Sequence, residues 1–117
     1  MNKKHHTHSR RNSEVQRALA EIIRADIKDP RISPLCSVTA VIVTADLKVC
    51  KAWISVLGDE EAEAATMAGL EAAKGFIRSR LAQTVNMRNT PEIRFVLDQS
   101  IAYGARMSQL IDETVGN

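Results

Sequence analysis

The sequence predicts an α+β fold, in which helices pack on one face of a small three-stranded sheet. Helical and strand-like patterns follow one another in the order helix, strand, strand, helix, helix, strand, helix, without the alternation of an α/β protein. The 117 residues suffice for one domain and leave little room for a second core. A content of 44% hydrophobic and 26% charged residues is typical of a globular protein.

Residues 1–8 are expected to form a flexible arm ahead of a single domain over residues 9–117. The arm is polar, and a core could bury none of it. Its histidines, His5, His6 and His8, could bind a metal ion, but no acid or cysteine nearby completes a ligand set. A solvated tail is therefore the favoured interpretation.

An amphipathic helix is predicted from about Arg10 to Lys28. Apolar residues from Val15 to Ile27 recur at helical spacing on one face, and charged residues line the opposite face. Asp29-Pro30 should end this helix, because the residue before a proline is pushed out of the helical region.

Two strands, Ser37–Thr44 and Val49–Leu57, are predicted from their β-branched residues and partial alternation. The short connection between them favours a hairpin in which Thr44 pairs with Val49.

The hairpin register also decides how the two cysteines are expected to lie. It places Cys50 opposite Val43 and Cys36 opposite Leu57, which holds the thiols roughly 20 Å apart. At that separation the two cysteines cannot form a disulfide, so we expect reduced thiols.

The segment after the hairpin has the pattern of two helices and a third strand. Glu60–Ala73 is rich in alanine and glutamate, with its acids near the start, where the helix dipole favours them. A helical pattern resumes after Gly75, with Phe76 on its apolar stripe, and Glu92–Asp98 alternates as a strand does. A last helix is expected from about Ser100.

Short motifs accompany these elements along the chain. They are Ile27-Lys28-Asp29-Pro30-Arg31, Asp46-Leu47, Ala73-Lys74-Gly75-Phe76-Ile77-Arg78, Pro91-Glu92-Ile93-Arg94-Phe95, Asp98-Gln99-Ser100 and Arg106-Met107-Ser108. In these motifs, and in their order and spacing, residues 10–111 resemble the ribosome-binding factor A family.

The resemblance implies a KH-like domain of the second type, with the order helix-strand-strand-helix-kink-helix-strand and a C-terminal helix. KH domains usually clamp single-stranded RNA backbone with a Gly-x-x-Gly loop. The resemblance places Ala73-Lys74-Gly75 at that position as a kink between helices. Contact with the shape and phosphates of folded RNA is therefore expected in place of strict reading of bases.

Nine basic residues form the candidate RNA-binding set. They are Arg10, Arg17, Arg24, Lys28 and Arg31 from the first helix and its exit, Lys74, Arg78 and Arg80 at the kink, and Arg88 beyond it. Phosphate contacts by such side chains release counterions, so binding should weaken steeply with salt. On the sequence alone, a solvated helix face explains the first-helix charges equally well, and the resemblance favours RNA. The chain has four aromatic residues among 117, so few rings are available to stack on RNA bases.

The resemblance implies a factor in the assembly of the small ribosomal subunit. Such a factor binds free or precursor small subunits through ribosomal RNA, assists late processing of that RNA and matters in the cold. A ribosome-assembly GTPase is a further candidate partner, and a monomer without a cofactor is expected.

The sequence itself argues against an enzyme and against a membrane protein. Cys36 and Cys50 lack a histidine partner within the folded region, so no nucleophile with its base is recognisable. No apolar stretch approaches the roughly 18 residues that span a bilayer, and a cytoplasmic protein is expected.

Two other classes of function stay open at this point. A free-standing KH-like binder of messenger or regulatory RNA predicts tight binding to short single strands. A protein-interaction module, using the acidic Glu60–Glu71 face or the terminal helix, predicts binding that ribonuclease does not abolish.

Overall fold

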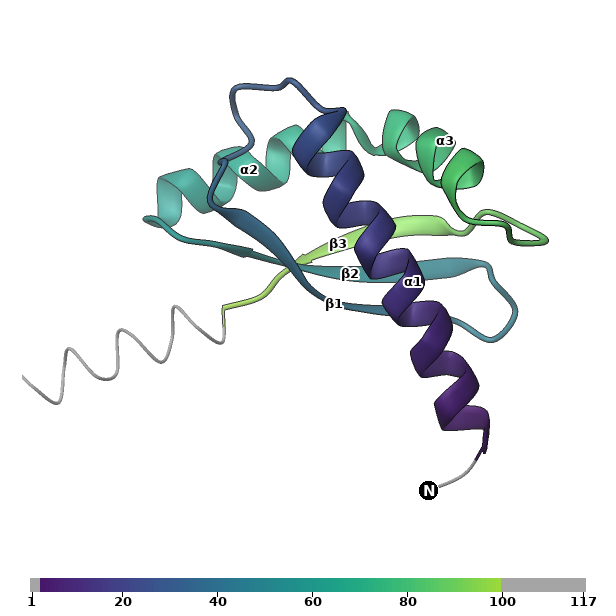
Figure 1. The fold of residues 1–117 in the computed structure, drawn as a ribbon. Helices are drawn as coiled ribbons and strands as arrows, with labels where there is room; N and C mark the ends of the chain where they lie inside the picture. The colour runs from purple at the N-terminus through teal and green to yellow at the C-terminus, as the bar shows by residue number, and fades with distance from the viewer. Residues whose placement is uncertain (1–2, 100–117) are drawn as a thin grey trace, which may run out of the picture.

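Three helices and three strands make up the part of the chain that the structure describes (Figure 1). The computed structural model describes the backbone of residues 3–99 and the side chains of residues 10–99. The elements are α1 (Lys3–Ala25), β1 (Cys36–Val43), β2 (Val49–Val56), α2 (Glu60–Ala72), α3 (Lys74–Thr84) and β3 (Glu92–Leu97). The last helix predicted from Ser100 lies outside the described residues.

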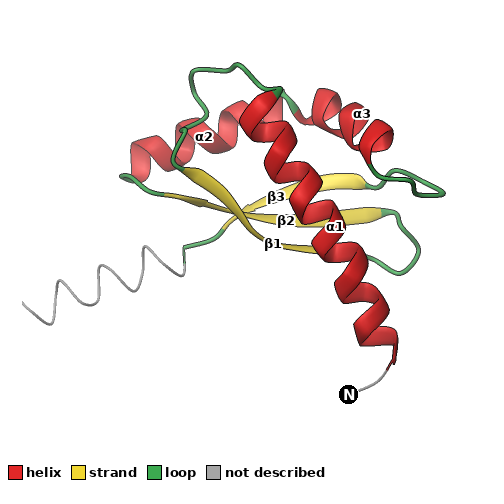
Figure 2. Cartoon of the chain, in the orientation of Figure 1, coloured by secondary structure: helices red, strands yellow, loops and turns green. Residues whose placement is uncertain are grey.

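The strands form a mixed sheet in the order β1-β2-β3. β1 and β2 are an antiparallel hairpin, whereas β3 runs parallel to β2 on its other side. Parallel neighbours need a long crossover, and here α2 and α3 supply it. The three helices cover the same face of the sheet (Figure 2), so the predicted α+β class and KH-like element order are confirmed over the described residues.

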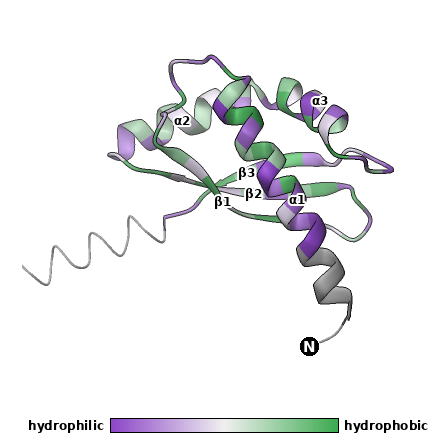
Figure 3. Cartoon of the chain, in the orientation of Figure 1, coloured by the Kyte–Doolittle hydropathy of each residue, from purple (hydrophilic) through white to green (hydrophobic). Residues whose placement is uncertain are grey.

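The core lies between the sheet and its helical cover. Along β2, Cys50, Ala52 and Ile54 are fully buried, whereas Lys51 on the opposite face is exposed. From the helices, Leu19 of α1, Leu70 of α2 and both Ile77 and Leu81 of α3 complete the core. From Arg10 onward, the ribbon of α1 alternates between hydrophobic and hydrophilic colours, as an amphipathic helix should (Figure 3).

The bounds of α1 differ from the prediction at both ends. The helix begins at Lys3 because no glycine or proline interrupts residues 3–10, although that stretch has no apolar stripe. It ends at Ala25, not Lys28, because the Asp29 carboxylate accepts a hydrogen bond from the backbone N–H of Arg31 at 2.9 Å and holds a non-helical turn there. The mobility of residues 1–8 stays a prediction.

The hairpin register is confirmed near its turn and wrong at its open end. Val43 pairs with Cys50 as predicted, but Cys36 pairs with Val56 and not with Leu57. The register shifts by one between Val38 and Ala40, where Thr39 is the extra residue of a β-bulge. Both cysteines are free thiols.

The helix break comes two residues before Gly75. Ala73 ends α2 and begins α3, with φ −91° and ψ 2°, and its carbonyl accepts the first α3 bond from Ile77 at 2.9 Å. Gly75 itself lies in the first turn of α3 with a negative φ, and a Cβ added to it would meet no atom within 4 Å. The kink is therefore confirmed, but its backbone does not require glycine.

Candidate nucleic-acid interface

The nine basic side chains of the candidate set all lie outside the core. Seven are exposed, and Lys74 and Arg80 are half-buried. They come from three places: the outer face of α1, the loop after it, and the region of α3. What each can do depends on whether an acid already neutralises it.

The outer face of α1 carries a stripe of arginines. Arg10, Arg17 and Arg24 are spaced seven positions apart, close to two helical turns, so they share one face of the helix. Arg24 pairs with Glu21 at 2.6 Å, one turn earlier, and both side chains are exposed. Such a pair contributes little to stability, and a phosphate could replace the carboxylate without unfolding the helix.

The loop after α1 contains two exposed cations, Lys28 and Arg31. An acid already engages the second of them. The guanidinium of Arg31 binds both carboxylate oxygens of Asp29 in a fork, with Nη2 at 2.7 Å from Oδ2 and Nε at 3.1 Å from Oδ1. These bonds raise the pKa of Arg31 and, together with the Arg31 backbone N–H, lower the pKa of Asp29. The main role of Arg31 is therefore to stabilise the loop.

Arg80 also has a structural role. Its Nε donates to Asp26 Oδ2 at 3.2 Å and its Nη1 to Gln83 Oε1 at 3.1 Å. The first contact joins α3 to the residue that follows α1, across 54 positions of sequence. Arg80 therefore ties two helices together, and its charge is already matched by a carboxylate.

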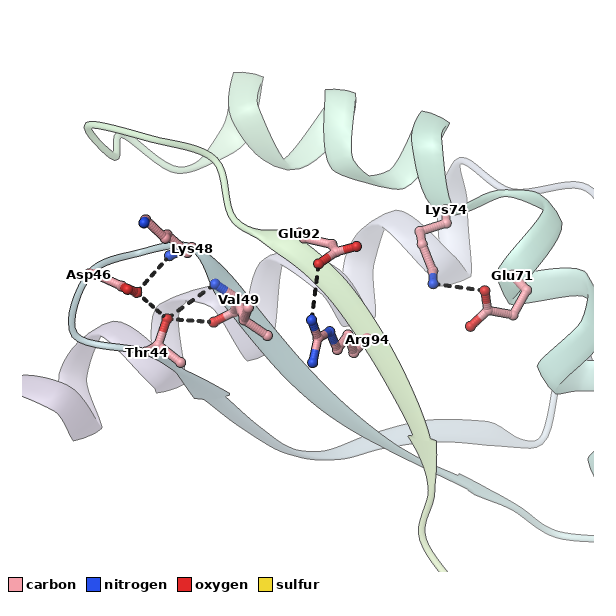
Figure 4. A network of polar contacts seen from close by, with 8 residues as sticks. All are labelled: Thr44, Asp46, Lys48, Val49, Glu71, Lys74, Glu92 and Arg94. Atoms are coloured by element: carbon pink, nitrogen blue, oxygen red, sulfur yellow. Dashed lines mark hydrogen bonds and ion pairs between the residues drawn. The ribbon is translucent and has the colours of Figure 1, made fainter.

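The kink brings together features suited to RNA that the sequence showed only in part. Lys74 is joined to Glu71 by a 2.7 Å ion pair across the break (Figure 4), and this half-exposed pair is weak enough for a phosphate to exchange. Within the described residues, no side chain caps the N-terminus of α3, so its backbone N–H groups and helix dipole favour an anion there.

The prediction that Phe76 lies on the apolar face of its helix is wrong. Its side chain is 49% exposed, while the adjacent Ile77 is fully buried. Neighbouring residues of a helix point about 100° apart, and in α3 it is Ile77 that faces the sheet. An exposed aromatic ring beside Gly75 offers a base a stacking surface, which the sequence interpretation had missed.

Four basic residues of the described part that lie outside the candidate set are also exposed: Arg11, Lys48, Lys51 and Arg94. Lys51 and Arg94 lie beside each other in the β2–β3 register, on the open face of the sheet, and Arg94 pairs with Glu92 at 3.4 Å (Figure 4). Lys48 stands in the hairpin turn, beside Arg78 and Arg88 of the candidate set. The sequence does not show that these basic residues lie near one another, because several of them are far apart along the chain.

Known proteins similar to this chain were found at the level of sequence and structure. The family model described as ribosome-binding factor A matches residues 7–111. The ribosome-binding factor A of Lachnospira eligens is 63% identical over 105 residues, covering 90% of this chain and 81% of that protein.

Two solved structures share the fold. The crystal structure of ribosome-binding factor A from Thermus thermophilus superimposes with a TM-score of 0.67 at 32% identity, covering 77% of this chain and 94% of that one. A Thermus thermophilus ribosome-binding factor A model fitted into a cryo-EM map of a 30S complex gives 0.61 at 28% identity, covering 75% and 91%. With most of its length matched by the family model and by a relative of high identity, this chain belongs to the ribosome-binding factor A family.

Proposed function

We propose that this protein binds free or precursor small ribosomal subunits through their ribosomal RNA and assists maturation of the subunit. The observation that carries the proposal is the kink at Ala73, which presents Lys74, the side-chain-free Gly75 and the exposed ring of Phe76 at the uncapped start of α3. The related Thermus protein fitted into a 30S complex supports the small subunit as the partner.

The mode of binding follows from the chemistry of this surface. Cations and helix N–H groups contact phosphates, and one ring stacks on an unpaired base, so folded RNA with a few unpaired nucleotides suits the kink better than a long single strand. The arginine stripe of α1 extends the phosphate contacts along a second element. Late ribosomal RNA processing, importance in the cold and a cytoplasmic location belong to the same proposal.

We further propose that the protein acts as a monomer, without catalysis of its own, and leaves the subunit with the help of another assembly factor such as a GTPase. Its thiols support the absence of nucleophilic chemistry. Burial raises the pKa of Cys50 to about 11, and burial also raises the pKa of Cys36, whereas a cysteine nucleophile needs a lowered value. No helix of the described part is long and apolar enough to cross a membrane.

Co-sedimentation tests the proposal. The purified chain is spun with isolated small subunits, with assembled ribosomes and with a short single-stranded RNA, at low and moderate salt. Selective, salt-sensitive association with small subunits is expected. Tight binding to the short strand alone would instead indicate a general KH-like binder, and association that survives ribonuclease would indicate a protein-interaction module.

A matched pair of variants locates the site. Lys74→Glu combined with Phe76→Ala should weaken subunit binding at least about fivefold, the loss expected from roughly 1 kcal/mol of base stacking alone. The control combines Lys51→Glu with Leu57→Ala, which makes the same charge change and also shortens one exposed apolar side chain. Equal loss in both variants would remove the kink from the site.

A further inference from the structure

A second positive site lies away from the kink, where the β1–β2 turn meets the loop between α3 and β3. The two segments enclose an open hollow of about 480 Å³, lined by Leu47, Lys48, Arg78, Arg88, Asn89 and Thr90. Lys48 comes from the turn, Arg78 from the middle of α3, and Arg88 from the loop before β3. Three elements therefore direct cations to one place.

Among the described residues, no acidic side chain lines this hollow to balance the three cations. The nearest carboxylate along the chain, Asp46, accepts from the Thr44 hydroxyl at 2.7 Å and the Lys48 backbone N–H at 3.1 Å, which turns it into the hairpin turn. The pKa of Asp46 is lowered chiefly by the Thr44 hydroxyl and in smaller part by the charge of Lys48, so Asp46 partly balances this cation from outside the hollow. Within residues 10–99, the structure shows no ion pair for Lys48, Arg78 or Arg88, whereas Arg24, Arg31, Lys74, Arg80 and Arg94 each have one.

Backbone contacts hold the walls of the hollow in place. Arg78 donates from Nη2 to the Thr90 carbonyl at 2.8 Å and from Nε at 3.3 Å, which fixes the loop to α3 and leaves Nη1 for another acceptor. The Glu92 backbone N–H donates to the Lys48 carbonyl at 2.9 Å and joins the loop to the hairpin turn. Arg78 is therefore already in position for an anion, so little ordering of this side chain would oppose binding.

The lining also narrows the class of ligand. Its described residues include no aromatic ring on which a base could stack, and the hollow is open to solvent rather than enclosed. These features fit a phosphodiester backbone that passes over the surface, held by point charges and by the Asn89 amide. A mononucleotide would leave its base without a stacking partner here.

We propose that Lys48, Arg78 and Arg88 form a phosphate-binding site that anchors an RNA backbone at a point distinct from the kink. This inference rests on the proposed function, which supplies the RNA. The site adds Lys48 to the residues that contact RNA and places a second anchor away from the start of α3.

The test neutralises two of the three cations and keeps Arg78, which supports the loop. Affinity for small subunits falls with salt, and Lys48→Gln with Arg88→Gln should make this fall less steep. The slope of log affinity against log salt should become less negative by about 1.4 to 1.8, since each phosphate contact contributes about 0.7 to 0.9. The control, Lys51→Gln with Arg94→Gln, removes the same charge from the open sheet face and should change the slope less. Equal changes in both would show a general field and overturn the site.

A second measurement separates the sources of phosphate and works even if the subunit does not bind. Amide NMR spectra of the labelled protein, titrated with inorganic phosphate and then with a short RNA, follow Lys48, Arg88 and Asn89. Saturable shifts at these amides with RNA, lost in the double variant, support the anchor. Shifts with inorganic phosphate alone would assign the hollow to a free anion and overturn the RNA anchor, and no shift with either ligand would overturn the site altogether.

Discussion

The hydroxyl of Thr39 donates a 2.6 Å hydrogen bond to Oδ2 of Asp98, across 59 positions of sequence. Thr39 is the bulged residue of β1, and Asp98 directly follows β3, so the bond reaches from one edge strand to the other past β2. The Asp98 backbone N–H also donates to the Ile54 carbonyl of β2 at 2.7 Å. Together these bonds fix the end of the sheet at which β3 finishes.

Thr39→Val should therefore destabilise the protein by about 1–2 kcal/mol, because it removes the donor to a half-buried carboxylate and keeps the shape of the side chain. Urea unfolding followed by the fluorescence of Trp53, the one tryptophan of the chain, measures the change. Thr39→Ser keeps the hydroxyl and is the control. If Thr39→Ser lost as much as Thr39→Val, the methyl group and not the hydrogen bond would be responsible.

The bulge at Thr39 also shows where prediction from the sequence ends. The third strand and the second helix were predicted within one residue at each end, because local alternation and alanine-rich composition decide them. The bulged Thr39 bonds to a residue that follows β3, and no local pattern around Thr39 reports that contact. The same limit hid the hollow, since Lys48 and Arg88 meet only through the parallel crossover.

Helical periodicity failed for a different reason at Phe76. The pattern contains two adjacent apolar residues, and the sequence does not say which of them faces the sheet. Packing chose Ile77, which is fully buried, and left Phe76 at the surface beside the kink. A large apolar residue that packing leaves at the surface is therefore a signal worth testing for function.

The Asp29–Arg31 fork predicts a pH dependence of stability. The pKa of Asp29 is lowered from 3.8, chiefly by the Arg31 side chain, so the ionised carboxylate favours the folded state. Its contribution is present above 3.8 and is lost as the pH falls through the lower folded pKa. The stability difference between the wild type and Arg31→Gln should shrink over that range. Unfolding curves between about pH 7 and about pH 2 measure it.

The control for the fork is the double variant Asp29→Asn with Arg31→Gln. If the fork carries the effect, Arg31→Gln in the Asp29→Asn background should change stability by the same amount at every pH. A pH-dependent difference that persisted without the Asp29 carboxylate would assign the effect to another group.

The two thiols should react slowly, and in a fixed order, with a thiol reagent at about pH 8. The thiolate is the reactive form, and a pKa of about 11 leaves roughly one Cys50 in a thousand ionised at that pH. Burial adds a steric barrier, because Cys50 is inaccessible whereas Cys36 is half-buried at the sheet edge. We expect Cys36 to react first and Cys50 only on unfolding. In Cys36→Ser, rapid modification of native Cys50 would contradict this.

Two glycines of the helix pair should respond oppositely to alanine. At Gly69 a Cβ would stand 2.7 Å from Cγ1 of Ile32, so Gly69→Ala should destabilise the protein by about 1–3 kcal/mol through overpacking. At Gly75 a Cβ would meet nothing within 4 Å and φ is negative, so Gly75→Ala should stabilise it by about 0.5–1 kcal/mol. Thermal and urea unfolding of both variants measure these changes.

The value of this pair lies in what Gly75→Ala does to binding. If RNA backbone approaches the start of α3 closely, the added methyl group should weaken binding to small subunits even though the protein becomes more stable. Loss of affinity with a gain in stability cannot come from partial unfolding, so it would locate the contact at the kink. Unchanged affinity in Gly75→Ala would mean that RNA does not approach this backbone closely, and that Lys74 and Phe76 act through their side chains alone.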